Sequence, residues 1–306
     1  MKLVGEKLTK RFNSFTALDN VNFKLEGKGC FGYLGPNGAG KTTTMKIFTT
    51  LLRPTSGQAL VNDVDVIKNP VEALKYVGAL IEDPEPYGFM SVEEFIDYAA
   101  KIRGKGTPDI QALKEKLDLP DLKRRCSKLS KGQKRRVFLA AILAQDPEIM
   151  ILDEPSAGLD PAESVIFRNL ILQFKKEKMI FLASHLLYEV NQVCDYVYFI
   201  NKGRIVAQSD VESLSKKFVS NAIRVEFNSS VEEKAIKQLT EEGIANRYEK
   251  ESDTAYLIVF DGKNETRSKI LEKLLPLGVR TISDSSLALE KAYLELISGK
   301  EDKSVD

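Results

Sequence analysis

The stretch "GPNGAGKTT" (residues 35–43) lies between an apolar run, "CFGYLG", and a helix-like segment, "KTTTMKIFTTLL". It satisfies the pattern G-x-x-x-x-G-K-[ST], and a strand before it with a helix after it is the context in which this pattern binds phosphates. Its glycines let the backbone turn tightly and aim N–H groups inward, and the helix N-terminus adds positive charge. We expect the phosphate chain of a nucleotide to be held by Gly35, Asn37, Gly38, Ala39, Gly40, Lys41, Thr42 and Thr43.

Two side chains of this loop have specific tasks. Lys41 is expected to reach the β and γ phosphates as a point charge, and the Thr42 hydroxyl to take a place on Mg²⁺. The loop alone does not distinguish kinases, GTPases and ATP-driven machines. "NKGR" (201–204) lacks the aspartate with which GTPases pair guanine, and Gly203 predicts a hairpin turn there instead.

A pair of acidic residues follows another strand-like run. "IMILDEP" (149–155) ends its apolar residues with Asp153 and Glu154. Buried strands of α/β sheets deliver such residues to the edge where ligands bind. We expect Asp153 to hold Mg²⁺ through water and Glu154 to orient or deprotonate the water that attacks the γ-phosphate.

One histidine, His185, is present in the whole chain, in "FLASHLLYEV" (181–190). Imidazole exchanges protons near neutral pH, but a lone histidine is more often a surface or structural residue. Its role therefore depends on the motifs around it.

The order of the predicted elements indicates two domains. Strand-like and helix-like segments alternate through residues 1–217, which predicts an α/β domain with a mostly parallel sheet and a helical subdomain at about 84–147. Residues 218–300 read as βαββαβ plus a final helix, the ferredoxin-like α+β pattern. The tail, 301–306, is predicted to be disordered.

Composition excludes several classes of protein. With 43% hydrophobic and 29% charged residues, the chain has the composition of an ordinary globular protein. Its net charge of +1 produces no strong positive electrostatic field that would indicate binding to nucleic acid. Its longest apolar runs, such as "VFLAAILA" (137–144), fall far short of the ~20 residues that span a bilayer. Three widely spaced cysteines suit reduced thiols in a cytosol.

Two further motifs lead to a family. "LSKGQKRR" (129–136) precedes the acidic pair and "SAGLD" (156–160) follows it. Taken in order with the phosphate loop, the acidic pair and "SH" (184–185), they make roughly residues 2–215 resemble the ATP-binding cassette (ABC) family of transport ATPases. The resemblance implies a P-loop NTPase fold of ABC type that binds ATP and Mg²⁺ and hydrolyses ATP.

The resemblance also implies roles for single residues. Ser130, Gly132 and Gln133 lie in the signature motif, which in this family caps the γ-phosphate held by the opposite subunit. Asp160 matches the loop that crosses between subunits, and His185 matches the switch histidine that contacts the γ-phosphate and the site of the attacking water.

Three further positions take their interpretation from the resemblance. Phe12 falls where the family stacks an aromatic ring on adenine, with Phe15 as a nearby competitor. Lys131 stands where the family most often has glycine. Its side chain either points away from the nucleotide or adds positive charge beside it. Glu82 occupies the position where the family usually has a glutamine that contacts Mg²⁺ and the attacking water. The resemblance therefore assigns Glu82 to the metal, and its carboxylate adds a negative charge near the γ-phosphate.

The family implies partners as well. ATP would join two chains, as a homodimer or as a heterodimer with a related cassette, and a separate transmembrane permease would receive the motion. The permease would dock near "DPEPYGFMS" (83–91), where Tyr87 and Phe89 either contact it or pack internally. The chain is then expected to be cytoplasmic and peripheral on the inner face of the cell membrane.

Glu82, the single cassette and the short C-terminal extension resemble the subfamily of drug and antibiotic-resistance exporters. One alternative is an importer ATPase whose C-terminal domain senses a ligand. Another is a soluble ABC ATPase that acts on ribosomes, DNA or cofactor assembly.

Overall fold

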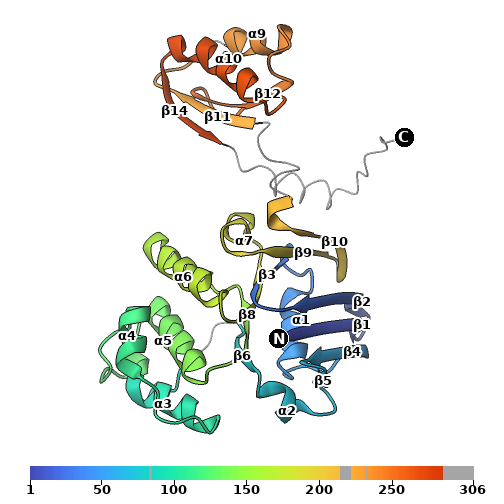
Figure 1. Ribbon diagram of the computed structural model, residues 1–306, viewed down its shortest axis with the longest axis vertical. Helices are drawn as coiled ribbons and strands as arrows, with labels where there is room; N and C mark the ends of the chain where they lie inside the picture. The colour runs from blue at the N-terminus through green and yellow to red at the C-terminus, as the bar shows by residue number, and fades with distance from the viewer. Residues whose placement is uncertain (83–84, 214–221, 232, 285–306) are drawn as a thin grey trace. The chain divides into compact units, whose positions relative to one another are not determined.

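The computed structural model describes residues 1–82, 85–213, 222–231 and 233–284 (Figure 1). The chain divides into two compact units, Met1–Ser209 and Asp210–Asp306. The division falls ahead of the predicted boundary between residues 217 and 218. The predicted helix at 286–299 and the tail at 301–306 lie outside the described residues.

A six-stranded sheet forms the centre of the first unit. Its order is β10-β9-β3-β8-β7-β6, made of β3 (Gly29–Leu34), β6 (Val77–Leu80), β7 (Ile149–Asp153), β8 (Met179–Ser184), β9 (Tyr196–Asn201) and β10 (Arg204–Asp210). The strands from β9 to β6 run parallel. β7 and β8 are buried along their whole length, as continuous apolar strands of a covered parallel sheet must be. The predicted α/β class is confirmed.

An antiparallel sheet packs against the central one. Its order is β2-β1-β4-β5, made of β1 (Lys2–Phe12), β2 (Phe15–Glu26), β4 (Ser56–Val61) and β5 (Val64–Asp65). The ring of Phe23 in β2 lies 5.5 Å from that of Phe48 in α1 (Lys41–Phe48) and 5.6 Å from that of Phe181 in β8. This aromatic contact fixes α1, and with it the phosphate loop, between the two sheets. The sequence patterns do not predict β4, β5, β6 or α2 (Pro70–Leu74).

Helices α3 (Val92–Ile102), α4 (Ile110–Leu117) and α5 (Lys131–Ala144) pack together as a lobe, green in Figure 1. Asp109 caps α4 by accepting a hydrogen bond from the Ala112 N–H, and Gly104 follows α3 in a left-handed conformation (φ +65°). These two residues thus limit the helices on either side of the connecting loop. Two more helices, α6 (Pro161–Phe174) and α7 (Leu187–Val193), connect strands of the central sheet.

The second unit has one sheet of order β12-β13-β11-β14, antiparallel throughout. Its described elements are β11 (Ala222–Phe227), α9 (Glu233–Glu241), β12 (Arg247–Lys250), β13 (Ala255–Val259), α10 (Asn264–Leu274) and β14 (Val279–Asp284), with a 3₁₀ turn at Leu275–Leu277. Both helices cover the same face of the sheet (Figure 1). The βαββαβ order with the last strand beside the first confirms the ferredoxin-like prediction.

The three cysteines are free thiols. Cys30 and Cys194 meet inside the first unit, with their sulfur atoms 3.5 Å apart. None of the helices in the described part of the chain is both long and apolar enough to cross a bilayer.

Candidate functional site

The phosphate loop joins β3 to α1 at the carboxyl edge of the central sheet. Gly40 caps α1 with φ +110°, a conformation that side chains rarely tolerate. A Cβ built on Gly35 would lie 2.2 Å from the carbonyl oxygen of Ile200, so this position also requires glycine. Local backbone geometry and close packing thus explain the glycine spacing of the motif.

Lys41 is buried at the first position of α1, with 5% of its surface exposed. Its ammonium donates to the carbonyl oxygens of Gly35, at 2.7 Å, and Pro36, at 3.2 Å. The same Nζ atom lies 3.2 Å from Oε1 of Glu154. Lys41 is therefore held at the mouth of the loop by two backbone carbonyls of the loop and by the carboxylate of Glu154.

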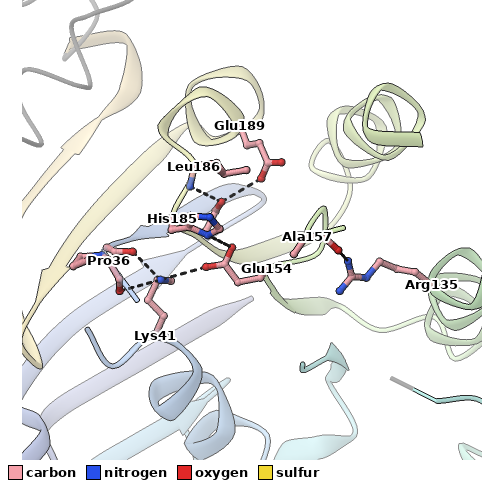
Figure 2. Close-up of polar contacts among 10 residues, drawn as sticks. Pro36, Lys41, Arg135, Glu154, Ala157, His185, Leu186 and Glu189 are labelled. Carbon is pink, nitrogen blue, oxygen red and sulfur yellow. Dashed lines mark hydrogen bonds and ion pairs between the residues drawn. The ribbon is translucent and has the colours of Figure 1, made fainter. Parts of the chain in front are cut away.

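Glu154 connects this lysine to the histidine. Its Oε2 atom lies 2.8 Å from Nδ1 of His185 and also accepts the His185 backbone N–H at 3.4 Å (Figure 2). Glu154 follows the last residue of β7 with φ +45°, a left-handed turn. That turn brings the carboxylate to both Lys41 and His185. A nucleophilic water between these groups and a γ-phosphate would be within reach of one carboxylate and one imidazole.

Asp153, the last residue of β7, is 2% exposed. Burial raises the pKa of its carboxyl group, an effect opposed by a hydrogen bond to Thr42 and increased by the neighbouring charge of Glu154. Within the described chain its Oδ1 atom accepts no hydrogen bond, which is costly for a buried carboxylate oxygen. An oxygen pair from a carboxylate and a hydroxyl beside a phosphate loop suits Mg²⁺, which usually keeps one or two carboxylates, phosphates and waters as ligands. The residues thus fit the expected metal, although the described residues hold no cluster of three His, Cys, Asp or Glu side chains.

The phosphate loop opens into a cleft of about 240 Å³. Phe12 and Phe15 face each other across the turn between β1 and β2, and both line this cleft. The ammonium of Lys10 lies 4.8 Å from the centre of the Phe12 ring. Either ring could stack on a base, and the cleft is further lined by Ala17, Asn37, Gly38, Gly40, Lys41, Thr42, Thr43 and Glu154. Ala39 instead packs in the core, and its N–H donates to the Pro36 carbonyl.

Glu82 follows β6 with φ +59°, and its Oε1 atom lies 2.5 Å from Nζ of Lys46 in α1. Its side chain is 62% exposed. The structure thus pairs the expected metal residue with an amine. None of the sequence motifs includes Lys46; the signal for it is its place on the helix that begins at Lys41.

The signature residues lie at the start of α5. Ser130 caps the helix, since its Oγ accepts the Gln133 N–H at 3.2 Å while the Gln133 side chain accepts the Ser130 N–H at 3.1 Å. Asp160 caps α6 in the same reciprocal way with Glu163. Of the described residues that line the cleft, none belongs to the signature or to "SAGLD". Lys131 points toward "SAGLD", where its Nζ atom lies 3.5 Å from the position that a Cβ on Gly158 would take.

A phosphate loop, a buried aspartate and a glutamate linked to a histidine define a P-loop ATPase site. The ABC transporter family matches residues 18–157. The bacitracin transport ATP-binding protein BcrA of Bacillus licheniformis is 32% identical over 95% of this chain and 96% of that protein. The lantibiotic transport ATP-binding protein SrtF of Streptococcus pyogenes is 34% identical over 68% of this chain and 90% of that protein. A solved ATP-binding subunit of an ABC transporter superimposes with a TM-score of 0.65 at 25% identity, covering 71% of this chain and 93% of its own.

The chain therefore belongs to the ABC transporter family and is an ATP-hydrolysing cassette.

Proposed function

We propose that this chain is the ATP-hydrolysing subunit of an exporter of drug or antibiotic type and drives a separate membrane subunit. The observation that carries this proposal is the similarity to BcrA, whose name states bacitracin transport. It extends over 95% of the chain and so includes the ferredoxin-like unit as well as the cassette.

The proposed chemistry uses the contacts around Glu154. Glu154 orients the attacking water and accepts its proton, and His185 holds that carboxylate while contacting the γ-phosphate. Lys41 binds the β and γ phosphates. Thr42 and Asp153 would hold Mg²⁺, which would neutralise developing charge on the phosphates.

Dimer formation completes the site in this proposal. The signature residues Ser130, Gly132 and Gln133, and Asp160, would serve the nucleotide of a second cassette, either an identical or a related chain. ATP bound between the two cassettes would favour the closed dimer. Hydrolysis removes the γ-phosphate contacts and shifts the population toward an open one.

A groove suits the docking of the membrane subunit. It has a volume of about 430 Å³ and lies between the central sheet and the helical lobe, lined by Thr49, Leu51, Leu74, Val77, Ala79, Ile81, Phe95, Ala99, Arg103, Phe138, Ala141, Ile142 and Gln145. Tyr87 and Phe89 are exposed by 49% and 68%, and their rings stack with centres 5.8 Å apart. Tyr87 also packs edge-on against Phe95, a lining residue of the groove. We propose that a short helix of the membrane subunit fills this groove, which places the cassette on the inner face of the membrane.

The test is a pull-down from native cells in mild detergent. The bait is Glu154→Gln with ATP and Mg²⁺, which holds the closed state in this proposal, and Lys41→Ala is the matched control that lacks ATP binding. Recovery of a multi-spanning protein without its own cassette supports the proposal. Recovery of ribosomal, nucleic-acid or assembly proteins without a membrane protein contradicts it.

A further inference from the structure

The N-terminal part of α5, residues 131–135, is tied to the "SAGLD" loop and to α6. Arg135, 3% exposed, donates from Nη1 to the carbonyl oxygen of Ala157 at 2.5 Å (Figure 2). Lys131 lies over Gly158, and the carboxylate of Glu163 lies against Gly132. These contacts hold the start of α6 at a defined place beside the signature motif.

The contact between Glu163 and Gly132 is close. A Cβ built on Gly132 would lie 2.1 Å from Oε1, 2.4 Å from Oε2 and 2.4 Å from Cδ of Glu163. The carboxylate thus takes the space that any side chain at position 132 would need. It is also tethered at the start of α6, where Oε2 accepts the Asp160 N–H at 3.4 Å.

The Glu163 carboxylate lies beside the N-terminal end of α5, where the helix dipole is positive. Gly132 is the second residue of α5, a helix of 14 residues, so Glu163 lies at the positive end of the helix dipole. A carboxylate there is stabilised by the same partial charge that favours a phosphate. In the proposed dimer, this helix end faces the γ-phosphate of the second cassette.

We propose that Glu163 is a gate on dimer closure: its carboxylate balances the helix end in the single cassette and opposes the arriving γ-phosphate. This inference rests on the proposed ATP-joined dimer. Two like charges beside one helix end repel, so the phosphate must displace or outweigh the carboxylate. Glu163 then sets the ATP concentration at which two cassettes join.

Sedimentation velocity of the full chain tests the gate. The parent is Glu154→Gln with Mg²⁺ and increasing ATP, compared with the same protein carrying Glu163→Gln. We expect Glu163→Gln to lower the ATP concentration for half-maximal dimer by about tenfold, with the difference shrinking in 0.5 M salt because screening weakens charge repulsion. Glu177→Gln, an exposed acid after α6, is the control for net charge and should leave that concentration unchanged.

A purely structural role predicts a different pattern. Glutamine can keep the reciprocal cap of α6, so the melting temperature of Glu163→Gln should match that of the parent. Glu163→Ala should melt lower, because Asp160 still caps α6 but the Glu163 half of the reciprocal cap is lost, yet it should still dimerise at lower ATP. An unchanged or higher ATP requirement for Glu163→Gln overturns the gate.

A different result would show that the proposed ATP-joined dimer itself is wrong. If the parent binds ATP but stays monomeric at every concentration, and Glu163→Gln does too, the ATP-joined dimer is wrong and the gate falls with it. A dimerising parent with no shift in the variant overturns the gate alone.

Discussion

The carboxylate of Glu154 lies 2.8 Å from the imidazole of His185, although 31 residues separate the two in the chain. Parallel pairing of β7 with β8 causes this contact, because it brings the ends of both strands to the same edge of the sheet. The other oxygen of Glu154 lies 3.2 Å from the Lys41 ammonium. One side chain thus connects the phosphate loop with the end of β8.

Glu154→Gln should abolish turnover while retaining ATP binding. The amide keeps the shape of the side chain but cannot accept a proton, and general-base catalysis contributes about 10²-fold or more. Phosphate release and equilibrium binding of a fluorescent ATP analogue measure the two effects. Activity within a few-fold of the natural chain would show that another group activates the water.

Asp153→Asn should stabilise the nucleotide-free protein at pH 7 while removing Mg²⁺-dependent hydrolysis. Burial raises the pKa of Asp153, so its ionised form destabilises the fold once the pH exceeds the unfolded pKa, near 4. The gain in melting temperature should therefore be largest at neutral pH and shrink as the pH falls toward 4.

Asp253→Asn is the control for that profile. The Lys250 ammonium lowers the pKa of exposed Asp253, so its ionised form favours the fold and is lost at low pH. Its substitution should bring no gain at pH 7. A gain for Asp153→Asn that is independent of pH would contradict the electrostatic explanation.

Phe12→Ala should weaken ATP binding about tenfold or more, since stacking an aromatic ring on a base contributes about 1–3 kcal/mol. Phe15→Ala is the matched comparison, because both rings line the cleft. Calorimetric titration with ATP measures both. A larger loss for Phe15→Ala would move the adenine contact to that ring.

Glu82→Gln should keep ATPase activity within about tenfold of the natural chain, a change of about 1.4 kcal/mol in the barrier. The amide restores the residue usual in the family and can still accept a hydrogen bond from a metal-bound water. Lys46→Met, which removes the partner of Glu82, gives the matched comparison. Complete loss of steady-state hydrolysis in Glu82→Gln would show that the carboxylate has a specific task.

Replacing Tyr87 and Phe89 together with serine should uncouple transport while ATP affinity stays within about twofold. Buried aromatic anchors at interfaces contribute about 2 kcal/mol or more each, so the membrane subunit should bind far more weakly. Transport assays with the reconstituted complex measure the loss, and ATP titration provides the control. Unchanged transport would exclude these two rings as docking contacts.

Much of the fold and site could be predicted from local patterns. The phosphate loop depends on glycine spacing between a strand and a helix, and Asp109 and Gly104 limit helices through their own backbone preferences. The ferredoxin-like order followed from the succession of strands and helices in the second unit. Glu163 carried a sequence signal too, since D-x-x-E in "DPAE" (160–163) is a capping pattern, but nothing local indicates what else its carboxylate touches.

The sequence by itself determined which chemical groups are available and most of the strand, helix and loop segments, because dihedral preference, capping and hydrophobic period act over a few residues. It left β4, β5, β6 and α2 unpredicted. The tertiary structure alone decided which groups meet. Strand pairing placed Glu154 between Lys41 and His185. Packing of α1 on the central sheet brought Lys46 to Glu82, and the approach of α6 to α5 brought Glu163 to Gly132. Such contacts depend on register and layer packing across 31 to 113 positions of the chain, and no local preference encodes them.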